Sequence, residues 1–372
     1  MSIARFLASL AVLVICPRFS ACEEFEWKPV NPAVAAARPS ASPELIIPES
    51  KDALGVDMTN WRNTTVILVF GENDAKLYLQ DKLLDRIWTG ARAVCAGFLP
   101  AVSNDDRLWF YVTLQKADVH QAAVKISDAR METNFYAWDG RRIRRALSRS
   151  SVAYRRMDPA VLSQRPGEGQ ILGGPVHAEW MAVELSGRLQ FSSLGIISLP
   201  PGVTLYDFVR GDLDGHGDRE IICAEGDDRA MVVYSEDGRR LWNQSDLPMA
   251  VSPAAIHTPY WVNRLGQVVL PLIFDADGDG KNEVLAAVGD LQQEHGILFD
   301  QATRGAGTKG ARLSILKWVS GNLQKQWETD PVPGELVSLF LDGTNRPYVA
   351  TKEKGAIRIH AITIPTMAGA RP

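Results

Sequence analysis

The 372-residue chain has few of the side chains on which most enzyme chemistry depends, with only four cysteines and six histidines. It has no His-Glu-x-x-His motif, no nucleophile elbow, no Cys/His pairing and no glycine-rich phosphate loop. Carboxylate pairs that cleave glycosides cannot be recognised in a sequence, because the fold sets their separation. We therefore expect no catalytic residues, and we expect that the protein is not an enzyme.

An excess of charge of one sign is also missing. The chain has 40 basic and 44 acidic residues, which gives a net charge of −4. The one basic cluster, Arg141 to Arg145, is interrupted by Ile143 and follows a turn, as in a solvent-exposed strand. No broad basic surface is indicated, so nucleic acid is excluded as an expected partner.

No apolar run is long enough to span a bilayer. The run Phe6–Cys16 follows Arg5 and precedes small residues, which is the order of a secretory signal peptide. We predict a signal peptide over residues 1–21 and an exported protein that is periplasmic, envelope-associated or secreted. The segment 19–22 resembles a bacterial lipoprotein box with Phe19 in place of Leu, so a lipid on Cys22 is one possible membrane contact.

Cysteines are scarce beyond this leader. Cys95 and Cys223 lie in apolar, strand-like runs. An oxidising compartment would permit a disulfide between them, and two separate core thiols are the alternative.

Prolines, alanines and serines are concentrated in residues 22–51, which we interpret as a tether that contains one possible strand, Leu45–Ile47. Residues 365–372 are expected to form a disordered tail. Between them, residues 52–364 show short apolar runs with alternating polarity, separated by Gly, Asp and Asn, and almost no long helical periodicity. This pattern predicts an all-β domain.

A hairpin pattern recurs five times, in residues 76–88, 135–145, 182–190, 232–242 and 315–327. Four copies have Asp-Gly or Ser-Gly at the turn, where glycine tolerates positive φ. Together with the strands before them they define six units, starting near residues 52, 92, 150, 202, 266 and 334. Repeats of this length predict a β-propeller of about six, possibly seven, four-stranded blades.

The last unit has only three strands, which would leave an unpaired sheet edge. We expect a strand from the N-terminus to close the propeller, with Leu45–Ile47 or Phe25–Lys28 as candidates.

Two acidic loops carry the strongest chemical signal. In the first, Asp275, Asp277 and Asp279 alternate with other residues and Glu283 follows, so several hard oxygen ligands converge, as calcium requires. An EF-hand is excluded because the position of its closing glutamate holds Ala286 and the flanks are strand-like. Solvated turns without an ion are the alternative interpretation.

These loops resemble the D-x-D-G-D-G-x-x-E cores of FG-GAP/VCBS repeats, which are propeller modules of integrin α-subunits and many bacterial exported proteins. The resemblance covers roughly residues 52–362 and is strong only in 202–330. It implies structural calcium at both loops, with the second weaker because His216 replaces the usual Asp or Asn. The implied ligands are Asp275, Asp277, Asp279, Lys281 through its carbonyl and Glu283, then Asp212, Asp214, His216 at the fifth position, Asp218 through its carbonyl and Glu220.

The resulting hypothesis is a calcium-binding module that acts by binding or as a scaffold in the cell envelope or outside the cell. Its partner would be an unidentified protein or polysaccharide. The aromatic segment 257–261 could face such a ligand or pack between blades. The alternative is a propeller hydrolase or lyase that acts on polysaccharide, and fold alone cannot decide between them.

Overall fold

The structure is a computed structural model of the whole chain. It describes residues 27–29, 45–48, 50–99, 105–116, 130–150, 152–157, 160–164, 176–185, 188–201, 203, 205–225, 229–254, 268–289, 307–342 and 344–364. The described residues include no helix long and apolar enough to cross a membrane. The predicted signal peptide (1–21), Cys22, the aromatic segment 257–261 and the predicted tail (365–372) lie outside them.

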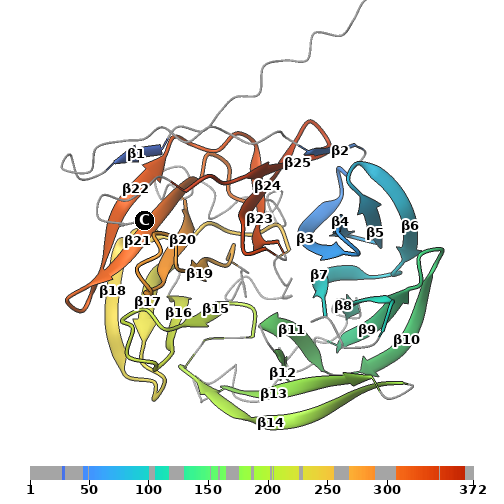
Figure 1. Cartoon of the computed structure of the whole chain (residues 1–372), viewed down its shortest axis with the longest axis horizontal. Helices are drawn as coiled ribbons and strands as arrows, with labels where there is room; N and C mark the ends of the chain where they lie inside the picture. The colour runs from blue at the N-terminus through green and yellow to red at the C-terminus, as the bar shows by residue number, and fades with distance from the viewer. Residues whose placement is uncertain are drawn as a thin grey trace, which may run out of the picture.

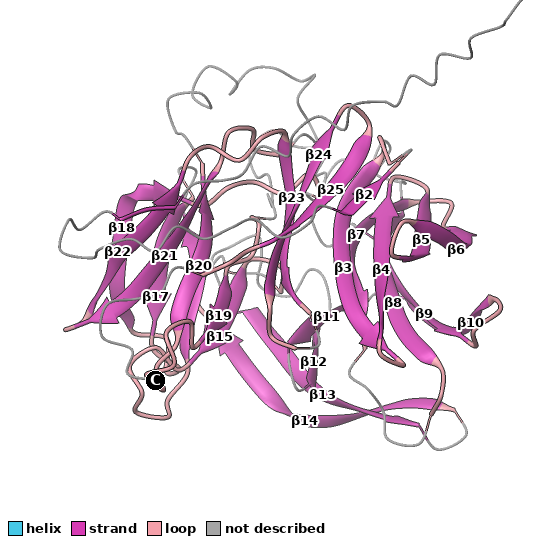
Figure 2. Ribbon diagram, turned by 45° about the horizontal axis from the view of Figure 1, so that its top comes forward, coloured by secondary structure: helices cyan, strands magenta, loops and turns pink. Residues whose placement is uncertain are grey.

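The described residues form a ring of six four-stranded antiparallel sheets, which confirms the predicted all-β propeller with six blades (Figure 1). Figure 2 shows the same ring tilted, built of strands and loops throughout. The strands of the six blades, in chain order from the innermost strand, are: β3 Ala53–Trp61, β4 Thr64–Gly71, β5 Asp74–Leu79 and β6 Lys82–Trp88; β7 Arg92–Phe98, β8 Leu108–Lys116, β9 Arg130–Trp138 and β10 Ile143–Ser150; β11 Ala153–Met157, β12 Ala160–Gln164, β13 Val176–Leu185 and β14 Leu189–Leu199; β15 Phe208–Gly211, β16 Glu220–Glu225, β17 Ala230–Tyr234 and β18 Arg240–Pro248; β19 Leu272–Phe274, β20 Glu283–Val288, β21 Arg312–Val319 and β22 Asn322–Thr329; and β23 Glu335–Leu341, β24 Pro347–Glu353 and β25 Ala356–Ala361.

The five predicted hairpins are the third and fourth strands of the first five blades. Turn chemistry explains their positions, because Gly140, Gly238 and Gly321 have φ values of 92°, 84° and 83°, which only glycine adopts without strain. In the first hairpin, Gln80 takes the positive φ instead. The local sequence therefore places each outer hairpin.

The N-terminal strand β2 (Leu45–Ile47) pairs antiparallel with β25 and becomes the fourth strand of the sixth blade. This confirms the predicted closure. The other candidate, Phe25–Lys28, overlaps β1 (Trp27–Pro29), which does not close the sixth blade. It adds a fifth strand to the outer edge of the fifth blade by pairing with β22.

The core lies between neighbouring blades. One apolar cluster, for example, joins Ile47, Val56 and Val69 to Ala350 and Ile357, so it links the sixth blade to the first. Cys223 is fully buried in another cluster, and Cys95 packs against its side. Both thiols are free. Of the two alternatives, a disulfide or two separate core thiols, the structure therefore has the separate thiols.

Candidate functional site

The two acidic loops occupy equivalent places in consecutive blades. Residues 212–219 connect β15 to β16 in the fourth blade, and residues 275–282 connect β19 to β20 in the fifth. Each loop begins just after a short innermost strand. Each ends at a glutamate that is the first residue of the second strand, Glu220 or Glu283.

The first aspartate of each loop organises the backbone. The two carboxylate oxygens of Asp275 accept hydrogen bonds from the N–H groups of Gly278 (2.7 Å) and Gly280 (3.0 Å). Asp212 does the same with Gly215 (2.7 Å) and Gly217 (2.9 Å). All four glycines have φ between 77° and 92°, the left-handed region that lets the loop curl around its own side chains.

The closing glutamates are buried and fixed. Glu283 is 0 % exposed, and its Oε2 accepts a 2.8 Å hydrogen bond from the N–H of Ala276. Glu220 is 4 % exposed, and its Oε2 accepts a 2.8 Å hydrogen bond from the N–H of Leu213. In both cases the glutamate carboxylate is thus fixed to the backbone at the start of its own loop.

The structure brings together three carboxylates in each loop, with ligand atoms within 4.8 Å of one another. The other side chains named from the sequence are not part of these clusters. His216 is exposed, and its Nδ1 lies 2.8 Å from Asp214 Oδ2. Lys281 is exposed and its N–H donates to Asp279 Oδ1. The clusters consist of Asp212, Asp214 and Glu220, and of Asp275, Asp277 and Glu283.

The two loops touch each other. Asn282 Nδ2 donates a 2.7 Å hydrogen bond to the main-chain oxygen of Asp212. The side chain of Lys281 runs past Gly215, where an added Cβ would lie 3.4 Å from Lys281 Cγ. The two acidic loops are therefore in direct contact across neighbouring blades.

A lysine from the third strand of the fifth blade contacts the acidic cluster of that blade. Lys317 Nζ lies 2.5 Å from Asp277 Oδ2 and 2.8 Å from Asp279 Oδ2. It also lies 3.1 Å from Glu283 Oε1, although without hydrogen-bond geometry. Lys317 therefore contacts two members of the three-carboxylate cluster, Asp277 and Glu283, and also Asp279, which is not part of that cluster.

The electrostatics of the loops follow from burial and these contacts. Burial raises the pKa of Glu283 and of Glu220, because charging a carboxyl group is costly away from water. The hydrogen bond from Lys317 holds the pKa of Asp279 below its usual value. Burial alone would lower the pKa of Lys317, but its three acidic contacts raise that pKa well above the usual value of a lysine. Lys317 is therefore a cation at neutral pH.

In the corresponding loops of other blades, the aspartates accept hydrogen bonds from different groups. In the second blade, Asp105 accepts hydrogen bonds from Arg107 Nη2 (2.7 Å) and Trp109 Nε1 (2.9 Å). In the sixth, Asp342 Oδ1 accepts from the N–H and hydroxyl of Thr344 at 2.7 and 2.6 Å. The sequence 57–60 has a faint likeness to the acidic loops, but it forms no loop, because Asp57 lies inside strand β3.

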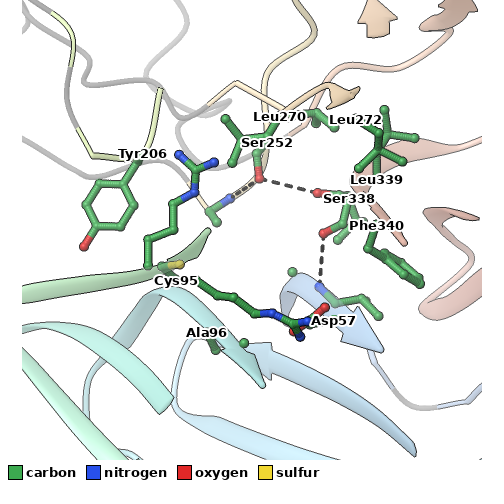
Figure 3. Close-up of a pocket in the computed structure, with 18 of the residues that line it drawn as sticks. Asp57, Cys95, Ala96, Tyr206, Ser252, Leu270, Leu272, Ser338, Leu339 and Phe340 are labelled. Carbon is green, nitrogen blue, oxygen red and sulfur yellow. Dashed lines mark hydrogen bonds between the residues drawn. The ribbon is translucent and has the colours of Figure 1, made fainter. Parts of the chain in front are cut away.

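A cavity of about 530 Å³ lies between the inner strands of the ring (Figure 3). One part of its wall is apolar and includes Leu270, Leu272 and Phe340. Another part is polar and includes Asp57 and Ser252. Its size is in the range of small-molecule pockets in proteins.

Polar groups around this cavity connect one blade to the next. Ser338 Oγ of the sixth blade accepts from the N–H of Val56 in the first at 3.1 Å. Asp57 Oδ2 of the first blade accepts from the N–H of Phe98 in the second at 2.8 Å. The chain of contacts continues with the Tyr111 hydroxyl, which accepts from the N–H of Arg156 at 2.9 Å, and with Arg155 Nη1, which donates to the carbonyl of Leu205 at 2.7 Å and to that of Phe208. These side chains hold the blades in register around the axis.

Fold and site together define a six-bladed β-propeller with an acidic double loop shared by its fourth and fifth blades. No known protein family and no curated protein matches the chain. Among solved structures it is similar to the exotype rhamnogalacturonan lyase YesX, with 12 % identity over 88 % of this chain and 75 % of that one and a TM-score of 0.42. It is also similar to the soluble aldose sugar dehydrogenase Asd from Escherichia coli, with 9 % identity over 87 % of this chain and 100 % of that one and a TM-score of 0.40. At such low similarity, neither a family nor a function follows from these matches.

Sequence reasoning identified both acidic loops and missed two residues that contact them. Lys317 follows Glu283 by a long stretch of chain, and Asn282 has the unremarkable position before the closing glutamate. No sequence pattern marks Lys317. It reaches Glu283 because β20 and β21 pair with Val284 opposite Leu316, which brings the next residues along, Glu283 and Lys317, close together.

Proposed function

We propose that the chain is an exported, calcium-binding propeller of FG-GAP/VCBS type that acts as a binding or scaffold module. The observation that carries the calcium part is the repeated cluster: three carboxylates within 4.8 Å of one another in two equivalent loops, each closed by a buried glutamate. Two copies of one geometry in consecutive blades support a common ion-binding role. Burying a carboxylate is unfavourable, and a turn that is only solvated would leave it exposed.

The donor set fits calcium. All side-chain donors are carboxylate oxygens, which suit a hard dication better than zinc or copper. Each loop also holds its first aspartate in place through two backbone N–H groups. The residues that would hold the ion are Asp212, Asp214 and Glu220, and Asp275, Asp277 and Glu283.

When bound, calcium would neutralise crowded carboxylates and fix a loop between two strands. We propose a structural role for it. Burial of Glu220 and Glu283 without a full complement of partners is unfavourable, and a bound dication would offset that cost. Because the unfolded chain has no preformed site, binding raises the free energy of unfolding, by about 2.7 kcal/mol per site at a hundred times the dissociation constant.

The test is calorimetric titration with calcium and thermal melting of the full-length protein, with calcium and with chelator. We expect calcium to raise the melting temperature, and Asp214→Asn to reduce that rise. Asp81→Asn is the matched control, since Asp81 lies in an exposed hairpin turn far from either loop. A melting temperature that is identical with calcium and with chelator would contradict the calcium part of this proposal.

Export rests on the apolar leader before residue 22 and has its own test. Mass spectrometry of the native protein should show a chain that begins near residue 22, with or without a diacylglycerol on Cys22. An intact leader in the exported protein would contradict it. The partner, which we propose to be a protein or a polysaccharide, is best sought among molecules that co-purify with the mature chain.

A further inference from the structure

Lys317 occupies a specific place in the fifth blade. It lies on β21, next to the start of β20, where the antiparallel register pairs Val284 with Leu316. Its side chain is 22 % exposed and reaches three acidic side chains of the 275–283 loop, at the distances given above. An ammonium group therefore sits among the carboxylates that the sequence assigns to calcium.

The described part of the fourth blade has no such group. Its register pairs Ile221 with Tyr234, so the residue that corresponds to Lys317 is Ser235. The Ser235 hydroxyl is engaged in its own turn, where it accepts a 3.0 Å hydrogen bond from the N–H of Arg239. Among the described residues, the one cationic side chain that contacts the 212–220 carboxylates is the exposed His216.

We propose that Lys317 is a built-in cation of the fifth blade, which takes the structural place of a divalent ion in the 275–283 loop. In the native protein a divalent ion then binds at the 212–220 loop, and the 275–283 loop accepts one only when Lys317 withdraws. The part of this inference that concerns metal affinity rests on the calcium binding proposed above. The part that concerns Lys317 as a structural cation does not.

Geometry makes the two cations mutually exclusive. Calcium needs its oxygen ligands at about 2.3–2.6 Å from its centre. Lys317 Nζ already lies 2.5 Å from Asp277 Oδ2 and 3.1 Å from Glu283 Oε1, so both cations would occupy the same space. The 275–283 loop has more carboxylates than the 212–220 loop, so by their number alone it would bind calcium more tightly. With Lys317 in place, the 212–220 loop is the one that binds calcium.

Burial makes this ammonium group important for folding. Glu283 is 0 % exposed, and removing the one cation beside it would leave a buried carboxylate without compensation. A surface ion pair contributes little because water screens it. Lys325 of the same blade is the matched lysine, because its side chain is similarly exposed, at 28 %, but its partner Glu328, 2.6 Å away on β22, is 21 % exposed.

The metal part is tested by calorimetric titration of the full-length protein with calcium. Wild type should bind one calcium ion, and Asp214→Asn should abolish that binding. Lys317→Met should bind two ions, whereas Lys317→Arg, which keeps the charge, and Lys325→Met should bind one. Two sites in the wild type, with the tighter site lost in Asp277→Asn, would overturn the proposal, as would a Lys317→Met variant that still binds one ion.

The structural part is tested by thermal melting in chelator, where no metal contributes. Lys317→Met should melt about 2–4 °C or more below Lys325→Met. The double variant Lys317→Met/Glu283→Gln should recover part of that loss, because the buried charge is gone. If Lys317→Met and Lys325→Met melt alike in chelator, Lys317 is not a structural cation. If no variant binds calcium, the proposed calcium function is wrong, and the melting result still decides the role of Lys317.

Discussion

The Asn282 side-chain amide donates a 2.7 Å hydrogen bond to the main-chain oxygen of Asp212, in the blade before its own. It joins the two acidic loops at the first residue of the 212–220 loop, whose carboxylate in turn holds the N–H groups of Gly215 and Gly217. The conformation of one loop is therefore coupled to that of the other.

Asn282→Ala should lower the free energy of unfolding by about 1 kcal/mol, because it leaves the Asp212 carbonyl without this donor. It should also weaken calcium binding at the 212–220 loop, whose first ligand is less well fixed. Urea unfolding and calorimetric titration measure the two effects. Asn322→Ala is the control, since Asn322 is exposed and donates only to Ser320 in its own turn at 3.3 Å. Equal effects of the two substitutions would show that the contact between loops is unimportant.

Closure by β2 makes a prediction about two neighbouring isoleucines. Ile47 is 0 % exposed, whereas Ile46 is 40 % exposed. Ile47→Ala should lower the free energy of unfolding by about 2–5 kcal/mol, the usual cost of a large-to-small change in a core, and Ile46→Ala by much less. A chain that starts near residue 52 should in addition form oligomers through the open edge of β25. A stable monomer of that shortened chain would contradict closure by β2.

His216 gives the 212–220 loop a pH dependence. Its hydrogen bond to Asp214 raises the pKa of His216 above 6.5. The ion pair is therefore fully present below pH 6.5 and is lost as the pH rises through the raised pKa. Protonated His216 also repels a dication, so calcium affinity at this loop should increase between about pH 6 and pH 8. Calorimetric titration across that range should show the increase in the wild type and a smaller one in His216→Asn. Identical pH profiles of the wild type and the variant would show that His216 does not cause the pH dependence.

Both core thiols should resist alkylation in the folded protein. Burial raises the pKa of Cys95 to about 11 and raises that of Cys223 still further. Because the thiolate is the nucleophile, iodoacetamide at pH 8 should label neither residue quickly. Cys95 lines the axial cavity, so it should react before Cys223, which is fully buried. Peptide mass spectrometry after timed labelling distinguishes the two, and rapid labelling of Cys223 would contradict its buried position.

The sequence was sufficient for features that depend on neighbouring residues. Turns such as Asp139-Gly140 and Asp237-Gly238 fix a hairpin through local backbone preferences, so the outer strands of the blades were predictable. The same holds for the acidic loops, whose carboxylate spacing is contained in nine residues.

Features that depend on pairing between distant strands were not predictable in the same way. Lys317 reaches Glu283 only because β20 and β21 pair in one register. The two N-terminal strand candidates were equally suited to an open edge, and the sequence alone did not show that the fifth blade takes one and the sixth the other. Asp57 resembled a remnant of a loop, although it lies in β3 and joins the first two blades.

The pairing of Leu45 with Ile359 has a kinetic consequence. Joining two ends of an unfolded chain of about 300 residues would cost roughly 5 kcal/mol in loop-closure entropy. The blades avoid most of that cost, because each forms from neighbouring strands and shortens the remaining span. During synthesis the segment that completes the ring is made first and its partner last, so β2 must wait until β25 exists. Until β2 and β25 of one molecule pair, each of them remains unpaired, and a second molecule offers each of them an alternative partner.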